Sequence, residues 1–452
     1  HVEGAGQFDE PVLSAEQQAA VDSDAQALVV VASAGSGKTE VVARRIQRLL
    51  LADPEGSGRV LALTYTVKAA DELRARLDAR LGSLARRVDS ETVHGFAHRL
   101  LRTHGTRIGL PLEPELLARD EDREELFRTW LRDRGDTAPE DLKSRLAGFD
   151  LARAKGQSIE GLNDWLQALE DTGTLDYPAL LARATELLTV ASARRQIRRL
   201  YTSIVVDEAQ NLTKAQYDFL IELGSERGEI VLPTMLVGDD KQSIVSFAGA
   251  DPRHIGAFSE VYGAERHELH TNFRSATVLA MASSNVAVAL GHPAGEQAAF
   301  AAPGMIAMEE LATEEDEGDR VAAWIEGLLD RGLPTEALGE DENNSVKAVD
   351  IAVLCRSAAG LRFVASALAE RDIPFALSST PKEWLTTVAG RVVLEAVSLK
   401  AAPDHHSTYW ELTRLLGVDL AEESVAAARA AVLDSEDGLT RAIAGVIDLT
   451  DV

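Results

Sequence analysis

The chain has 452 residues, of which 45% are hydrophobic and 26% are charged, a composition typical of globular domains and unlike that of a disordered chain. At about 100–200 residues per domain, this length predicts two or more domains. The 46 Lys and Arg against 73 Asp and Glu give a net charge of −27, which excludes a uniformly basic nucleic-acid-binding surface. Most of the excess negative charge falls after residue 200, so we expect any DNA to bind in a local groove built from the first 200 residues.

Two further classes of protein are disfavoured. No apolar run approaches the roughly 18–20 residues that span a bilayer, so we expect a cytoplasmic protein with no membrane partner. The single cysteine, Cys355, excludes an intramolecular disulfide framework and a cysteine-rich metal site. We expect Cys355 to be a small buried hydrophobic residue.

Short apolar runs alternate with helical patterns in the first part of the chain. Strands are expected at 28–31, 60–64, 203–207 and 234–238, with helices at 41–51 and 69–81. This alternation predicts an α/β fold with a parallel sheet covered on both faces. Between about 95 and 200 one helical pattern follows another, which predicts an inserted helical domain.

A second α/β pattern begins near residue 266. It is interrupted by the acidic stretch 314–317, expected to be a solvated helix start or loop, and by a polar loop at 339–345. Strands are expected to resume at 350–354 and 373–377. From about 400 to the end the pattern is helical and rich in alanine.

A phosphate-binding loop lies between the first expected strand and the next helix. It has the sequence Ala32-Ser33-Ala34-Gly35-Ser36-Gly37-Lys38-Thr39. Small residues let backbone N–H groups surround the β- and γ-phosphates of a nucleotide, Lys38 reaches the same oxygens, and the Thr39 hydroxyl is placed to bind Mg²⁺. This loop predicts binding of a nucleoside triphosphate.

A pair of carboxylates follows the strand at 203–207. Asp207 is placed to hold Mg²⁺ through water, and Glu208 to orient and deprotonate the attacking water. Together with the phosphate loop, this pair predicts hydrolysis of ATP or GTP.

The order of these motifs resembles that of the UvrD/Rep/PcrA group of superfamily 1A DNA helicases. The resemblance implies a RecA-like P-loop NTPase domain 1A (8–90 and 198–263) with an all-helical insertion 1B (91–197). It further implies a second, incomplete RecA-like domain 2A (264–400) and the start of a helical domain 2B (401–452). By the same resemblance the chain would hydrolyse ATP with Mg²⁺ and translocate along single-stranded DNA or DNA with a single-stranded tail, with 3′ to 5′ polarity, in repair or recombination.

The resemblance also implies roles around the nucleotide. Gln17, in Leu13-Ser14-Ala15-Glu16-Gln17-Gln18, would read adenine, and Arg45 would lie beside the nucleotide. Gln242 would sense the γ-phosphate. In the segment 269–275, Phe273 would stack on adenine and Arg274 would act as an arginine finger.

The DNA track is implied in the same way. Thr64, Tyr65 and Thr66 match a segment that grips single-stranded DNA, with Tyr65 in place of the usual phenylalanine and still able to stack on a base. His94 and Phe247 would line the same track. Lys155 and the pair Asp176-Tyr177 lie in segments that resemble the helical insertion, although packing or solvated roles suit them equally.

Departures from the pattern leave alternatives open. Val245 and Ala248 stand where the group has an aromatic residue and an arginine, Asn211 replaces an aspartate, and the last two helicase motifs are not found. The chain is therefore also compatible with the motor portion of a RecB/AddA-like helicase-nuclease, with a nuclease domain or partner beyond it. A third alternative is a nucleotide-sensing regulatory module, for example in phage defence, without unwinding activity.

Overall fold

The computed structural model describes residues 11–377, except 112–113, 118–119, 137–140, 155–156, 247–248, 293–296, 300–303, 335–336 and 338–343. The chain divides into two compact units, the first made of residues 1–307 with 336–341 and the second of the remainder. The expected domain 2B and the end of 2A lie outside the described residues. No helix in the described ranges is both long and apolar enough to cross a membrane.

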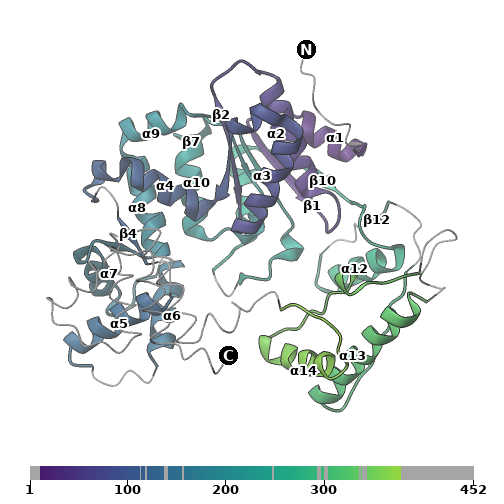
Figure 1. The fold of residues 1–452 in the computed structure, drawn as a ribbon. Helices are drawn as coiled ribbons and strands as arrows, with labels where there is room; N and C mark the ends of the chain where they lie inside the picture. Colours follow the sequence, from purple (N-terminus) through teal and green to yellow (C-terminus); the bar gives the residue numbers. More distant parts are fainter. Residues whose placement is uncertain are drawn as a thin grey trace, which may run out of the picture. The chain divides into compact units, whose positions relative to one another are not determined.

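A six-stranded, all-parallel sheet forms the centre of the first unit (Figure 1). Its strand order is β10-β1-β9-β6-β2-β3. The strands are β1 (Ala27–Ala32), β2 (Arg59–Thr64), β3 (Val88–Thr92), β6 (Tyr201–Val206), β9 (Thr234–Gly238) and β10 (Glu265–Leu269). The four strands predicted from apolar runs are confirmed, because each is buried along almost its whole length between two layers of helices.

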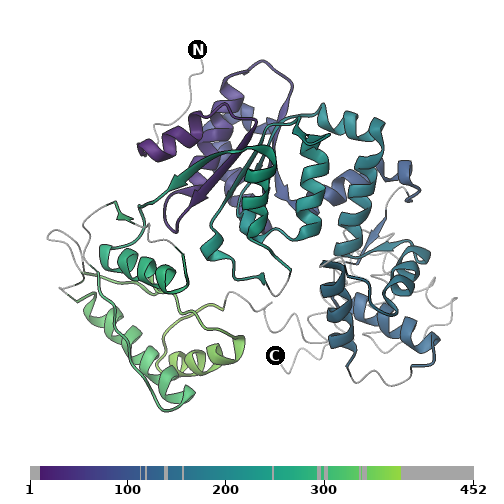
Figure 2. The ribbon, with the colours of Figure 1, turned by 180° about the vertical axis from the view of Figure 1, so that it is seen from behind.

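Helices cover both faces of this sheet, and each face has its own hydrophobic core. Alternate residues of β1 show the division: Leu28 and Val30 belong to one core, and Ala27 and Val29 to the other. The first core is closed by α1 (Ala15–Asp22), α2 (Lys38–Leu51) and α3 (Val67–Leu81), which lie across the face seen in Figure 1. The second, seen from behind in Figure 2, is closed by α4 (Val93–His104), α8 (Tyr177–Thr189), α9 (Ala191–Arg198), α10 (Lys214–Gly224) and α11 (Arg253–Tyr262).

Two strands of the sheet differ from expectation. Residues 265–269, expected to open the second α/β domain, form β10, which pairs with β1 from Leu28–Glu265 to Ala32–Leu269. The expected boundary at 264 is therefore wrong for this strand, since an alternation of strand and helix does not say which sheet a strand joins. Strand β3 was not predicted, because its sequence Val-Asp-Ser-Glu-Thr lacks an apolar run and lies at the sheet edge.

The helical insertion has a core of its own, smaller than expected. It is built from α5 (Asp120–Asp133), α6 (Leu142–Ala154) and α7 (Leu162–Asp171) around Phe127, Trp130, Phe149 and Trp165. Two-residue strands β4 (Glu115–Leu116) and β5 (Thr174–Leu175) pair beside it. The flanking helices α4, α8 and α9, expected within the insertion, share the core of the sheet instead. A run of helical patterns does not reveal which core each helix joins.

A buried ion cluster holds α5 and α6 against the start of α8. Asp176 caps α8 by accepting from the N–H of Ala179 at 2.8 Å, and its second oxygen accepts from Arg153 at 2.6 Å and pairs with Arg123 at 3.2 Å. Asp176 therefore has a structural role, which is the packing alternative that the sequence left open. Lys155 lies outside the described residues.

The first unit also contains shorter elements and one further helix. They are 3₁₀ turns η1 (Gly82–Arg87), η2 (Gly105–Ile108), η3 (Ala209–Asn211) and η4 (Asp240–Gln242), strands β7 (Ser225–Glu226), β8 (Glu229–Ile230), β11 (Thr271–Asn272) and β12 (Gln297–Ala298), and helix α12 (Thr277–Ala289).

The second unit is a helix pair, α13 (Glu314–Arg331) and α14 (Ala358–Ala369), with a small core that includes Ala322 and Ile325. The expected solvated helix start at 314–317 is confirmed: Thr313 caps α13 and the acidic first turn complements the helix dipole. The turn η7 (Ala348–Asp350) precedes the apolar run 351–354.

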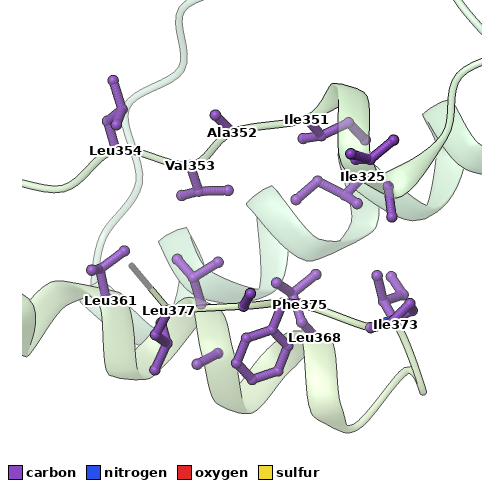
Figure 3. A pocket seen from close by; sticks show the side chains of 16 residues that line it. Ile325, Ile351, Ala352, Val353, Leu354, Leu361, Leu368, Ile373, Phe375 and Leu377 are labelled. Atoms are coloured by element: carbon purple, nitrogen blue, oxygen red, sulfur yellow. The ribbon is translucent and has the colours of Figure 1, made fainter. Parts of the chain in front are cut away.

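The expected strands at 350–354 and 373–377 form no ladder among the described residues. A strand requires hydrogen bonds to a neighbour, which an apolar run alone does not specify. The two runs instead line opposite sides of an apolar cavity of about 570 Å³ above α14 (Figure 3). Cys355, expected to be buried, is exposed, because it follows the first run where the chain turns toward α14.

Candidate active site

The phosphate loop occupies the turn between β1 and α2. Gly35 and Gly37 have φ values of 68° and 81°, which favour glycine. The Ser36 hydroxyl donates to the carbonyl of Ser33 at 2.7 Å, so the loop curls back on itself. Lys38 begins α2, and the loop therefore places an anion at a helix N-terminus, where free N–H groups and the helix dipole stabilise negative charge.

A mostly polar pocket of about 210 Å³ opens over this loop. It brings together segments that are far apart in the sequence: residues 33–40 with one side chain each from four other places. The lining residues are Ser33, Ala34, Gly35, Ser36, Gly37, Lys38, Thr39, Glu40, Arg76, Glu208, Gln242 and Arg274. Every lining residue belongs to the first unit. Ala32, the remaining residue of the predicted motif, is buried as the last residue of β1, and its carbonyl accepts from the Lys38 ammonium at 3.3 Å.

Asp207 and Glu208 follow β6 and differ in environment. Asp207 is buried, and burial together with the charge of Glu208 raises its pKa to about 6. One of its carboxylate oxygens accepts from the N–H of Glu208 at 2.9 Å. Glu208 has a φ of 55°, an unusual conformation for a residue with a side chain, and it lines the pocket.

Two residues that the sequence did not single out join Glu208 to Gln242. Gln210, 1% exposed, donates to the Glu208 carboxylate, and its amide oxygen accepts from the N–H of Asp239 at 3.1 Å. The Asp239 carboxylate accepts from the Gln242 amide at 2.6 Å and from the N–H of Lys241 at 3.1 Å. In the sequence, Gln210 could have been noticed because it follows the acidic pair by two residues, but this spacing does not identify Asp239 as its partner.

The loop after β10 lies directly beside the phosphate loop. The N–H of Phe273 donates to the carbonyl of Gly35 at 2.9 Å. Asn272, 2% exposed, organises this loop, because its side-chain oxygen accepts from the N–H groups of Arg274 at 2.8 Å and Ser275 at 2.9 Å. Arg274 lines the pocket over the phosphate loop, whereas Phe273, 38% exposed, does not.

Two residues predicted to contact the nucleotide, Gln17 and Arg45, form hydrogen bonds with other parts of the protein. The Gln17 amide accepts from the N–H of Ser14 at 2.9 Å and donates to the carbonyl of Ser36 at 2.8 Å, so it holds α1 to the phosphate loop. Each end of the amide retains one further hydrogen-bonding position. Arg45 is buried and donates to the carbonyls of Val21 and Ser23. Arg45 therefore links α2 to the end of α1, and its contact with a nucleotide stays a prediction.

The predicted DNA-facing residues have unequal exposure. Tyr65 is 40% exposed, whereas Thr64 is buried at the end of β2 and Thr66 caps α3 through the N–H of Ala69. His94 packs edge-on against Tyr177 with ring centroids 5.2 Å apart, and burial lowers the pKa of His94. Phe247 lies outside the described residues.

Comparison with known families gives an assignment that matches this geometry. The family model described as the UvrD/REP helicase N-terminal domain matches residues 13–160 and 150–263. The chain belongs to the UvrD/REP helicase family. The match includes the phosphate loop, the carboxylate pair and Gln242, and the observed parallel sheet is the RecA-like fold that the resemblance implied.

Individual relatives extend the match beyond residue 263. The chain is 30% identical to DNA helicase II of Haemophilus influenzae and 28% identical to DNA helicase II of Escherichia coli, over 77% and 80% of its own length. It is 30% identical to ATP-dependent DNA helicase UvrD1 of Mycobacterium bovis over 97% of its length. The chain spans about half the length of the DNA helicase II relatives, with 48% and 51% of their residues covered, and 61% of UvrD1.

The residues of this UvrD/REP site fit a magnesium ion. Asp207 is a buried carboxyl next to a second carboxylate, and a cation would offset the cost of ionising it. Carboxylate and hydroxyl oxygens are the ligands that Mg²⁺ prefers, and Thr39, which lines the pocket over the phosphate loop, supplies a hydroxyl. Asp207 and Thr39 therefore form a suitable donor set for Mg²⁺ carried with a nucleotide.

Proposed function

We propose that this chain is the ATP-hydrolysing motor portion of a DNA helicase that translocates along single-stranded DNA. The observation that carries the proposal is the pocket over the phosphate loop, which brings Lys38, Glu208, Gln242 and Arg274 together. Surface arginines and polar strand ends are common, but three such groups from separate segments, gathered around a phosphate loop and its lysine, are the arrangement that phosphoryl transfer requires.

Each of these residues has a role that follows from its position. The loop N–H groups and Lys38 bind the β- and γ-phosphates, and Arg274 stabilises the charge that develops on the γ-phosphate. Asp207 and Thr39 hold Mg²⁺, which neutralises phosphate charge when bound. Glu208 orients the attacking water and accepts its proton, and its φ of 55° aims the carboxylate at the pocket.

Coupling to DNA would run through the buried hydrogen-bond chain from Glu208 through Gln210 and Asp239 to Gln242. Loss of the γ-phosphate would change the contacts of Glu208 and Gln242, which these hydrogen bonds connect. Gln242 ends η4, so the change would reach the segment that follows, where Ile244 is 83% exposed. Tyr65, at the end of β2, supplies a ring on which a base can stack. Single-stranded DNA or a single-stranded tail is the substrate of this proposal, with 3′ to 5′ movement in repair or recombination.

The experiment is ATP hydrolysis by the purified chain, measured with Lys38→Ala and Glu208→Gln as controls for the pocket. We expect Mg²⁺-dependent turnover that both substitutions reduce by at least about 10³-fold, since each removes a group acting on the transferring phosphoryl. Lys38→Ala should also weaken nucleotide binding, whereas Glu208→Gln should leave binding intact. Turnover that persists in both variants would contradict the proposal.

A nucleotide-sensing module is the second candidate, favoured by the net charge of −27 and by Val245 in place of an aromatic residue. It predicts ATP binding that is abolished by Lys38→Ala, with no hydrolysis in the presence of DNA.

A further inference from the structure

Glu40, in the first turn of α2, carries an unusual number of positive partners. Its carboxylate accepts from Arg80 at 2.7 and 2.8 Å and from Arg44 at 3.0 Å, and it pairs with Arg76 at 3.5 Å. Burial raises the pKa of Glu40, but the hydrogen bonds from Arg44 and Arg80 outweigh it and leave the pKa below its usual range. Glu40 is therefore ionised, with three guanidinium groups around one carboxylate.

The three arginines are not equivalent. The side chains of Arg44 and Arg80 are 17% and 14% exposed, whereas that of Arg76 is 44% exposed. The contact of Arg76 with Glu40 is also the longest of the three, at 3.5 Å. A contact at the upper limit of hydrogen-bond length, made by a largely exposed arginine, is worth little, so Arg76 can leave Glu40 at small cost while Arg44 and Arg80 continue to satisfy the carboxylate.

Arg76 and Glu40 both line the pocket over the phosphate loop. A triphosphate there offers several anionic oxygens, and a guanidinium group binds phosphate oxygens through short charge-assisted hydrogen bonds, often two at once. Arg76 thus has a weak partner on one side and a strong acceptor site on the other.

We propose that Glu40 is a positioning residue that holds Arg76 at the rim of the phosphate-loop pocket, from which Arg76 moves onto the phosphates of a bound nucleoside triphosphate. This inference rests on the proposed nucleotide-binding function. Binding would exchange the Arg76–Glu40 contact for an Arg76–phosphate contact, and Glu40 would keep Arg44 and Arg80 as its partners.

The test is a double-substitution cycle on nucleotide affinity, measured as the equilibrium binding of a fluorescent ATP analogue with Mg²⁺ by the full chain. We expect Arg76→Ala to weaken binding about tenfold, as loss of a charge-assisted hydrogen bond does. Glu40→Gln should strengthen binding about threefold by releasing Arg76, and it should have no effect when combined with Arg76→Ala. Arg76→Lys should restore part of the loss.

Controls separate this proposal from other effects of charge. Glu72→Gln removes a carboxylate from the exposed surface of α3, where Glu72 pairs with Lys68 at 3.8 Å, and it should leave affinity unchanged. An equal effect of Glu40→Gln with and without Arg76 would overturn the inference, as would full affinity in Arg76→Ala. If the unsubstituted chain fails to bind, or binds as well with Lys38→Ala, the proposed function fails too, and that outcome is visible before Glu40 is changed.

Discussion

The carbonyl of Gly35 accepts a hydrogen bond from the N–H of Phe273, 2.9 Å away, and this contact fixes the loop that carries Arg274 against the phosphate loop. The approach is close enough that a Cβ on Gly35 would lie 2.4 Å from the Asn272 side-chain oxygen and 2.9 Å from the Arg274 Cβ. The phosphate loop and the loop that carries Arg274 are therefore parts of one packed structure.

Gly35→Ala tests this close approach. The substitution strains a φ of 68° and pushes Asn272 and Arg274 away, so we expect at least a tenfold loss of ATP turnover and about 2 kcal/mol of stability. Gly109→Ala is the matched control, since Gly109 has a φ of 80° with nothing near its Cβ position. It should cost about 1 kcal/mol and leave turnover unchanged. Equal turnover in the two variants would show that the contact has no role in catalysis.

Asp207→Asn should stabilise the protein while abolishing turnover. The pKa of Asp207 is raised from 3.8 to about 6 in the folded state by burial and by Glu208. Between about pH 4 and 6 the folded chain retains a proton that the unfolded chain releases, so stability falls as pH rises through this window and stays lower above it. Removing the carboxyl should raise the free energy of unfolding by about 1–3 kcal/mol at pH 8.

Urea unfolding at pH 4 and pH 8 measures this difference, with the exposed Asp71→Asn as the matched control. The gain should be small at pH 4 and absent in the control at both pH values. Mg²⁺ with a nucleotide should stabilise the unsubstituted protein more than Asp207→Asn. Lower stability of Asp207→Asn at pH 8 would contradict the account of its burial.

Gln210→Ala should break the hydrogen-bonded connection between Glu208 and Asp239. The substitution leaves the buried N–H of Asp239 without its acceptor at 3.1 Å, which costs about 1–3 kcal/mol of stability, and it removes the donor to Glu208. We expect slower turnover with little change in nucleotide affinity, because neither lost contact binds phosphate directly. Equilibrium nucleotide binding and steady-state turnover are both measured. A loss of nucleotide affinity with no change in the turnover rate would show that Gln210 supports nucleotide binding instead of hydrolysis.

Tyr65→Ala should weaken single-stranded DNA binding by about 1–3 kcal/mol, the contribution of one stacked base. Fluorescence anisotropy with a labelled oligodeoxythymidylate measures the change, and Tyr65→Phe should bind as tightly as the unsubstituted chain. Nucleotide affinity without DNA should be the same in all three proteins. Unchanged DNA binding by Tyr65→Ala would remove this ring from the proposed track.

The sequence was sufficient for local features and insufficient for contacts between distant segments. The phosphate loop, its flanking strand and helix, and the acidic pair after β6 each follow from a short run of residues. Gln210 and Asp239, which are hydrogen-bonded to each other, lie 29 residues apart in the sequence, and no spacing rule identifies such a pair. Arg45 is a similar case, because the sequence did not predict that its side chain donates to the carbonyls of Val21 and Ser23.

The assignment of residues 265–269 to the second α/β domain was wrong for a related reason. Its sequence, Glu-Arg-His-Glu-Leu, has the charged residues of an exposed sheet edge, but only pairing with β1 decides which sheet it extends. The same limit applies to the runs 351–354 and 373–377, whose apolar residues line a cavity without forming a ladder in the described part of the second unit.

The most direct test of the central claim is the ratio of the ATP turnover rate with saturating single-stranded DNA to the rate without it. The account predicts a ratio of at least about ten, since the hydrogen-bond chain from Glu208 to Gln242 links hydrolysis to the DNA-facing segments. The ratio should fall toward one in Tyr65→Ala at DNA concentrations too low to saturate that variant. A ratio of one for the unsubstituted chain, with DNA bound and basal turnover intact, would contradict the claim that this pocket drives movement on DNA.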